Sequence, residues 1–315
     1  MLDSIYDRYT IFMKIFNLIK SVLNNDSQCL VPLKKKDLYS INNKIILKKR
    51  IGEKSVFGTI FLSSIKPLKY KFITKVQVHD SIGKNELNVL NYVRSYALKT
   101  KNFHLPLYII NFNCNSYDIF DKRLPPNITG KYFYSYDSTI AELANGNMNE
   151  YIESVFKSGK NISEKIITAI KQCIIAFMTI HHLGIFHNDA HLGNFLFFKV
   201  KKNKGYYKYN YNNISFYLNN TGAIFVIWDF GKSRQIESSD NIIKDYSYKF
   251  FYSIERIIRK MSFKYNIPIE QKLRNFILLA TSDYNMYLNN DTIIKKIFLD
   301  ENINSGKLLG TVDLF

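Results

Sequence analysis

The segment from residue 163 to residue 184 constrains the fold more than any other part of the chain. Its apolar side chains recur at helical spacing, which predicts a long helix with a wide apolar face. The residues on that face are Ile167, Ile170, Ile174, Ile175, Phe177 and Met178. A helix of this kind is stable when other elements cover its apolar face, so it belongs to a domain with a substantial core.

Strand patterns come before this helix, and helical patterns come mostly after it. β-branched and aromatic residues alternate with polar ones over residues 44–49, 59–63, 72–78 and 138–143. Helical spacing covers residues 81–99, and it dominates the chain after residue 240. This order predicts an α+β fold with two lobes that meet near residues 142–147.

These patterns also suggest boundaries for the parts of the chain. We expect a helical extension over residues 1–42, because residues 11–23 are amphipathic. A β-rich N-lobe is expected over residues 43–142, and a mainly helical C-lobe over residues 143–315. Residues 199–222 are a low-complexity stretch of Lys, Tyr and Asn, which predicts a long loop within the C-lobe.

Composition excludes several classes of protein. The chain has 315 residues, of which 46% are hydrophobic and 22% charged, and this composition is not that of a disordered protein. The three cysteines (Cys29, Cys114 and Cys173) are too few and too widely spaced for a disulfide framework or a zinc site. There is no apolar run long enough for a transmembrane segment and no pattern typical of a signal peptide, so we expect a cytoplasmic protein.

Two carboxylates and one amide in the sequence are candidate active-site groups. Asp189 and Asn194 follow the long helix in the sequence HNDAHLGN, and Asp229 follows the apolar run IFVIW. Carboxylate and amide oxygens are hard ligands of the type that Mg²⁺ prefers beside phosphate oxygens. A carboxylate such as Asp189, when it is not needed by the metal, can accept a proton from an attacking hydroxyl.

The pattern H-x-D-x-x-x-x-N followed by D-F-G resembles the catalytic loop and the metal-binding motif of the protein kinase superfamily. The resemblance implies a two-lobed protein-kinase-like fold and transfer of a phosphoryl group from ATP with Mg²⁺. It assigns proton acceptance to Asp189 and Mg²⁺ binding to Asn194 and Asp229. The residue two positions after Asp189 is His191, as in haspin-type kinases, and an imidazole there can contact the transferred phosphate.

The same resemblance implies a nucleotide site in the N-lobe. The segment from Gly52 to Gly58 stands where the family has its glycine-rich loop, with Ser55 near the place of the missing middle glycine. Lys75 follows in a predicted strand, and Glu86, near the start of the next helix, is its natural partner. Without the resemblance, the first feature is an ordinary turn and the two charges are solvated surface groups.

Residues 141–146 (AELANG) resemble the hinge of the family, where backbone groups of Glu142 and Ala144 hydrogen-bond to adenine. Asp245 resembles the aspartate that anchors the catalytic loop. Asn188 replaces the arginine that many kinases have before the catalytic aspartate, so activation by loop phosphorylation is not expected.

We therefore expect a Ser/Thr protein kinase that uses ATP and Mg²⁺ and modifies a protein hydroxyl. The alternatives are a small-molecule kinase of the choline or aminoglycoside type, a nucleotide-binding pseudokinase and, from charge alone, a nucleic-acid-binding protein. His191 and the short segment after Asp229, which has no Ala-Pro-Glu, favour the small-molecule kinase. The net charge of +18 predicts a protein substrate with an acidic surface, and weak contacts with nucleic acid or anionic membranes.

Overall fold

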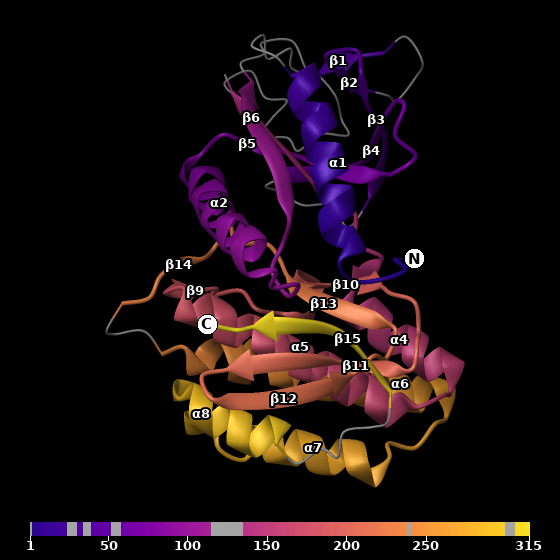
Figure 1. Ribbon diagram of the computed structural model, residues 1–315, viewed down its shortest axis with the longest axis vertical. Coiled ribbons are helices and arrows are strands. Elements are labelled where there is room, and N and C mark those ends of the chain that lie inside the picture. Colours follow the sequence, from indigo (N-terminus) through magenta and orange to yellow (C-terminus); the bar gives the residue numbers. More distant parts are fainter. Residues whose placement is uncertain are drawn as a thin grey trace. The chain divides into compact units, whose positions relative to one another are not determined.

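The computed structural model describes residues 2–23, 30–33, 39–51, 58–114, 135–237, 241–299 and 306–315 (Figure 1). The chain divides into two compact units. The sheet unit consists of Tyr6–Asn91 and Leu107–Leu143, and the helical unit of Met1–Ile5, Tyr92–Pro106 and Ala144–Phe315. Strands dominate the first unit and helices the second, so the structure has the mixed α and β composition that the sequence predicts.

The sheet unit is built on one antiparallel sheet of seven strands in the order β1-β2-β3-β4-β5-β7-β6. Its strands are β1 (Val31–Pro32), β2 (Tyr39–Ile41), β3 (Ile45–Ile51), β4 (Gly58–Ile65), β5 (Phe72–Val78), β6 (Tyr108–Cys114) and β7 (Tyr136–Glu142). Every second side chain of β4 from Thr59 to Ile65 is buried, as the period of a strand requires. The four expected strands are confirmed as β3, β4, β5 and β7.

Helix α1 (Asp7–Val22) packs on β6 within the sheet unit. Its buried residues recur every three or four positions, and the helix also buries Arg8, whose guanidinium pairs with the Glu142 carboxylate at the end of β7. The expectation of a helical extension over residues 1–42 needs correction, because this region also supplies β1 and β2 to the sheet. Helix α1 and these two strands belong to the sheet unit, whereas Met1–Ile5 belongs to the helical unit.

Helix α2 (Ser81–Thr100) begins in the sheet unit and ends in the helical unit. The other helices are α4 (Met148–Ser158), α5 (Ile162–His182), α6 (Tyr252–Tyr265), α7 (Gln271–Thr281) and α8 (Asn290–Ile293). Shorter 3₁₀ turns are η1 (Leu192–Asn194) and η3 (Tyr284–Leu288), and π-helical turns are η2 (Asp245–Phe251) and η4 (Ile294–Phe298). None of these helices, nor any other in the described part of the chain, is long and apolar enough to cross a bilayer.

Helix α5 is the centre of the helical unit, and it is the long helix that the sequence predicts. Every residue from Ile166 to Ile180 is buried, so the helix is covered on all sides and not only on its apolar face. Its polar Gln172 is satisfied by β13 (Ala223–Ile227), because the side chain donates to the Ala223 carbonyl and accepts from the Phe225 amide. The helix therefore positions β13 by hydrogen bonds as well as by packing.

Three smaller sheets complete the helical unit. β13 pairs with β10 (Phe195–Lys199), which pairs with β8 (Gly146–Asn147). β9 (Ile185–Phe186) pairs with β14 (Arg234–Gln235). The third sheet contains β11 (Gly205–Tyr211), β12 (Ile214–Asn219) and β15 (Lys307–Asp313).

The third sheet corrects the expectation of a loop over residues 199–222. The stretch contains the antiparallel hairpin of β11 and β12, and β15 joins β11 in parallel (Figure 1). Its buried aromatic side chains include Tyr207, Tyr209 and Phe216, of which the last two stack with ring centroids 5.3 Å apart. The Tyr and Asn residues that look like low complexity are therefore strand residues with one buried face.

We predict that Phe177→Ala lowers the free energy of unfolding by about 3–5 kcal/mol, since Phe177 is fully buried on α5 and its loss leaves a cavity. Its ring packs against Phe195, Tyr246 and Phe250. Urea unfolding measures the effect. Phe263→Ala is the matched control, because Phe263 is 91% exposed and its removal should change stability by less than about 0.5 kcal/mol. Equal effects of the two substitutions would contradict the central position of α5.

Candidate active site

The pairing of β10 with β13 brings together residues that are far apart in the sequence. Phe195 lies opposite Ile227, so the residue before β10, Asn194, meets the residues after β13. The Trp228 amide donates to the Asn194 carbonyl over 2.8 Å. Asp229, the next residue, therefore leaves the sheet beside Asn194. From the sequence, Asn194 and Asp229 are expected to share one metal site. The pairing of β10 with β13 explains how they come to lie next to each other.

Two residues of this region have left-handed backbone conformations that side chains rarely adopt. The φ angle is 61° at Asn188 and 63° at Asp229. Asparagine and aspartate tolerate this region better than other residues with a side chain, although it costs of order 1 kcal/mol or more. The conformation explains why a short polar residue at position 188 suits this loop, and it turns the chain sharply at Asp189 and at the end of β13.

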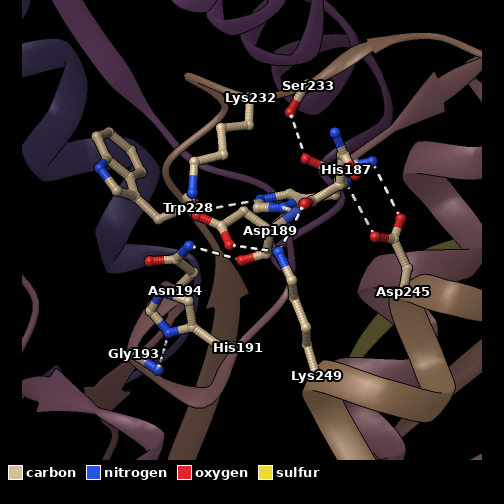
Figure 2. Close-up of polar contacts among 11 residues, drawn as sticks. His187, Asp189, His191, Gly193, Asn194, Trp228, Lys232, Ser233, Asp245 and Lys249 are labelled. Atoms are coloured by element: carbon tan, nitrogen blue, oxygen red, sulfur yellow. Dashed lines mark hydrogen bonds and ion pairs between the residues drawn. The ribbon is translucent and has the colours of Figure 1, made fainter.

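The loop from His187 to Asn194 is held in place by Asp245, the first residue of η2. The Asp245 carboxylate accepts hydrogen bonds from the backbone amides of His187 (3.0 Å) and Asn188 (2.9 Å). His181 of α5 also contacts it, with 3.1 Å between Nε2 and Oδ2. The Asp245 side chain is 1% exposed, so water does not compete for these bonds. The anchoring that the sequence suggested for Asp245 is confirmed by this geometry (Figure 2).

His187 serves the structure of the loop. It is fully buried, and its Nε2 lies 2.9 Å from the Trp228 carbonyl, so Nε2 donates and carries the proton. Its Nδ1 then accepts from the Asp189 amide over 3.3 Å. Burial lowers the pKa of this imidazole, although the nearby Asp245 carboxylate opposes the shift. A neutral His187 thus ties the loop to the end of β13.

The Asp189 carboxylate is flanked by two lysines. Lys249 Nζ lies 2.7 Å from Oδ1, and Lys232 Nζ lies 2.8 Å from Oδ2 (Figure 2). Partial burial raises the pKa of Asp189, but the hydrogen bonds and charges of Lys232 and Lys249 outweigh it and lower that pKa to about 2. Asp189 is therefore a carboxylate at neutral pH. Lys249 also donates to the Asn188 carbonyl over 2.9 Å, which fixes its position relative to the loop.

Asn194 and Asp229 are the oxygen donors that could hold a cation. Asn194 Nδ2 donates to the Asp189 carbonyl over 2.8 Å, so its Oδ1 is the atom left for a metal. Within the described residues there is no group of three or more His, Cys, Asp or Glu side chains suited to a metal ion. An amide oxygen and one carboxylate fit Mg²⁺, which takes its remaining ligands from water and phosphate, better than a metal held by protein alone.

His191 caps the short turn η1. Its Nδ1 accepts from the Gly193 amide over 3.0 Å, so in the neutral imidazole Nε2 carries the proton. A Cβ added to Gly193 would stand 2.7 Å from the His191 ring, so a larger residue there would force the ring to move. The exposed ring thus has one nitrogen used by the loop and one available as a donor.

The expected partner of Lys75 is present in the sheet unit. Lys75 Nζ on β5 donates to both carboxylate oxygens of Glu86 on α2, each over 2.8 Å. The Glu86 side chain is only 3% exposed, and that of Lys75 is 16% exposed. The pair is therefore not the solvated surface charge that was the alternative. A buried pair of this kind is costly to separate, so it holds the lysine head in one place.

The other nucleotide-site residues have mixed outcomes. Gly52 and Ser55 lie outside the described residues. Gly58 begins β4, where an added Cβ would stand 3.0 Å from the Val76 carbonyl oxygen, so glycine is explained there by the close neighbouring strand.

Glu142 ends β7, and its side chain accepts from Leu107 N over 2.9 Å as well as pairing with Arg8. Ala144 is the first residue of the longest segment of the helical unit. The hydrogen bonds to adenine that are expected from the backbone groups of Glu142 and Ala144 stay predictions.

The sequence analysis did not identify Lys232 and Lys249. Lys232 directly follows the Asp229-Phe230-Gly231 motif, and Lys249 stands four residues after Asp245, about one helical turn. That spacing was the available signal, because it places Lys249 on the same side of η2 as the residue that anchors the loop. The lysines matter because they contact the carboxylate to which the motif assigns the chemistry.

A pocket of about 360 Å³ lies beside this loop in the helical unit. Its lining residues are Phe186, Asn188, Lys244, Asp245 and Lys249. Lys249 belongs both to the pocket and to the ion pair with Asp189, so the pocket is next to the candidate reactive carboxylate. The lining carries the Lys244 and Lys249 ammonium groups and the Asp245 carboxylate, which accepts from two backbone amides.

No protein-family model matches the chain, and no curated protein matches it. Among solved structures, the kinase domain of BubR1 is similar to this chain, with a TM-score of 0.40 and 12% sequence identity. The similarity covers 73% of this chain and 62% of that chain, so this chain spans less than two thirds of that domain's length. A similarity of this size carries no functional information, in contrast to the side-chain geometry described above.

We predict that Lys249→Met raises the pKa of Asp189 above its value of about 2, since one of its two ammonium partners is lost. Carboxyl ¹³C chemical shifts in an NMR pH titration measure it, and Lys260→Met, at an exposed position of α6, is the control. The pKa of folded Asp189 lies below that of the unfolded chain. The stability that the ion pairs give is therefore complete at neutral pH and is lost as the pH falls from about 4 toward 2. An unchanged pKa would show that Lys249 does not pair with Asp189 in solution.

Proposed function

We propose that the protein is an ATP-dependent phosphotransferase with a protein-kinase-like fold, and that it transfers the γ-phosphoryl group of ATP to a Ser or Thr hydroxyl of a protein. One observation carries the proposal. The β10–β13 register and the Asp245 anchor gather Asp189, Asn194 and Asp229 in one loop region of the helical unit, in the order of the catalytic motifs.

The proposed role of Asp189 is to orient the acceptor hydroxyl and take its proton. The hydroxyl oxygen forms a bond to the γ-phosphorus while the bond from that phosphorus to the bridging oxygen breaks, and ADP leaves. Asp189 receives the proton once the attacking oxygen has become acidic. A carboxylate with a pKa of about 2 is a weak base, so its contribution is orientation and late proton acceptance.

Lys232 and Lys249 supply positive charge beside this carboxylate. Their side chains are 58% and 40% exposed, so the ammonium groups are accessible from solvent while they contact Asp189. We propose that they also face the negative charge of the transferred phosphoryl group, since fixed cations stabilise that charge as it moves. The Nε2–H of His191 is a further donor from the same loop.

Each unit has its own candidate groups for binding a nucleotide. Asn194 and Asp229 would hold Mg²⁺, which would neutralise phosphate charge. In the sheet unit, the Lys75 ammonium fixed by Glu86 would bind the α- and β-phosphates of ATP. The backbone of Glu142 and Ala144 would bind adenine, and the segment with Gly52, Ser55 and Gly58 would cover the phosphates.

The lysines beside the loop favour an acidic acceptor. Lys244 and Lys249 line the 360 Å³ pocket that adjoins Asp189, so an acceptor in this pocket meets two ammonium groups. Acidic residues near the acceptor Ser or Thr would pair with them. The pocket also suits a small hydroxyl compound with a negative group, which keeps a small-molecule kinase as the second candidate.

We predict that Asp189→Asn lowers the rate of phosphoryl transfer about 10²–10⁴-fold while ATP binding is retained, because the amide cannot accept the proton. Transfer from γ-labelled ATP and binding of a fluorescent ATP analogue measure the two properties. Asp283→Asn is the matched control, since this aspartate is 45% exposed and pairs with Lys296 on the surface. Equal turnover by wild type and Asp189→Asn would contradict the assignment.

The acceptor is identified by incubating the protein with γ-labelled ATP, Mg²⁺ and one of three acceptors: a basic protein, an acidic protein or a mixture of hydroxyl metabolites. Preferred label on the acidic protein is the expected result. Label on a metabolite would replace the protein acceptor by a small molecule. Bound but uncleaved ATP would indicate a pseudokinase.

A further inference from the structure

The basic segment that follows β10 borders a second pocket, of about 260 Å³, in the helical unit. It shares no lining residue with the pocket beside Asp189. Lys165 of α5, with Lys199 and Lys202 at and after the end of β10, provides three ammonium groups. Tyr151 of α4 and Phe197 of β10 contribute aromatic side chains to the wall. These lysines are not used by the proposed phosphotransfer, so their convergence needs another explanation.

The charge of this pocket is positive and uncompensated by its lining. The lining residues include three lysines and no carboxylate. The two carboxylate oxygens of the nearby Glu164 accept from the Asn161 and Asn219 side chains over 3.2 and 3.5 Å. Burial and then the charge of Lys202 lower the pKa of Lys165, although the Glu164 carboxylate opposes the shift, so the Lys165 and Lys202 ammonium groups lie close enough to repel each other. An anion between them would remove that repulsion.

The Tyr151 hydroxyl is a second, independent sign of a ligand. Tyr151 is 6% exposed, and its buried hydroxyl has no hydrogen-bond partner among the described residues. The Thr221 side chain stands near it without completing a bond of normal geometry. Buried hydroxyls are normally satisfied, so an orphaned one in a pocket wall marks a place for an external acceptor. The ring itself is fixed by packing against Phe197 and Phe225.

The backbone around the pocket is tied down by hydrogen bonds. The Val200 amide donates to the Gly222 carbonyl over 3.1 Å, and the Asn220 side chain donates to the Lys201 carbonyl over 2.9 Å. Lys165 Nζ donates to the Lys160 carbonyl over 2.6 Å, which restrains the ammonium group. The backbone around the pocket and the Lys165 ammonium are thus held in place before a ligand arrives, and such preorganisation favours binding.

We propose that this pocket binds a phosphoryl group, either free or carried on a peptide. A phosphate dianion accepts hydrogen bonds on several oxygens, which matches three ammonium groups and one hydroxyl donor. A single carboxylate would leave part of this donor set unused. The proposal does not depend on phosphotransfer at Asp189, because the two sites have separate residues.

Calorimetric titration of the intact chain tests the proposal with three probes: inorganic phosphate, a phosphoserine peptide and the same peptide unphosphorylated. Saturable binding of phosphate or of the phosphopeptide, but not of the unphosphorylated peptide, is expected, and binding should weaken as salt rises. Tighter binding of the phosphopeptide than of phosphate would assign the ligand to a peptide. Equal affinities would assign it to the free ion. Absence of saturable binding at millimolar concentration of either phosphate probe would overturn the proposal.

Two variants locate the bound phosphate. We expect Lys202→Ala and Tyr151→Phe each to weaken its binding about tenfold, whereas Lys272→Ala, which removes an exposed charge of α7, has no effect. Tyr151→Phe should leave the melting temperature of the ligand-free protein unchanged or higher, because it removes an unsatisfied buried hydroxyl. Binding that persists in both variants and disappears in Lys232→Ala would place the phosphate beside Asp189 and overturn the proposal.

Discussion

The hydrogen bonds from the backbone of His187 and Asn188 to the Asp245 carboxylate determine the geometry of the loop at Asp189. A buried carboxylate that receives two amides cannot shift without leaving donors unsatisfied. The π-helical turn that begins at Asp245 also carries Lys249, whose ammonium group reaches the Asp189 side chain. One short helical segment therefore fixes both the backbone of the loop and the orientation of its central carboxylate, and the packing of Phe177 of α5 against Tyr246 and Phe250 holds that segment.

The regular elements were the most predictable part of the fold. The strands around Lys75 alternate polar and apolar residues, and α5 has apolar residues on every turn, so local periodicity was sufficient. Residues 199–222 show the limit of this method. Their buried face consists of Tyr, Phe and Leu among many Asn and Lys residues, and the strand that completes their sheet, β15, is distant in the sequence. A pattern that depends on a distant partner cannot be recognised locally.

The candidate site likewise contains residues that could be predicted from the sequence and residues that could not. Asp189, Asn194 and Asp229 stand in recognisable motifs, and the partner of Lys75 followed from the cost of an unpaired buried charge. Lys232 and Lys249 carry no motif, and many other lysines of this basic chain look equivalent in the sequence. Lys232 and Lys249 contact Asp189 because the chain turns at Asp229 and because η2 is bound to the loop through Asp245. The left-handed backbone at Asn188 and Asp229 was likewise hidden, because residue type permits that conformation but does not require it.

The parallel pairing of β11 with β15 links two segments separated by roughly a hundred residues of chain, and contacts of such long range form late in folding. During synthesis, the β11–β12 hairpin must therefore wait beside the rest of the helical unit with one strand edge open. An open edge of this kind can pair with another strand, and its flanking lysines oppose such pairing by charge. Before β15 pairs, the positive charge near this hairpin therefore disfavours aggregation through the open edge.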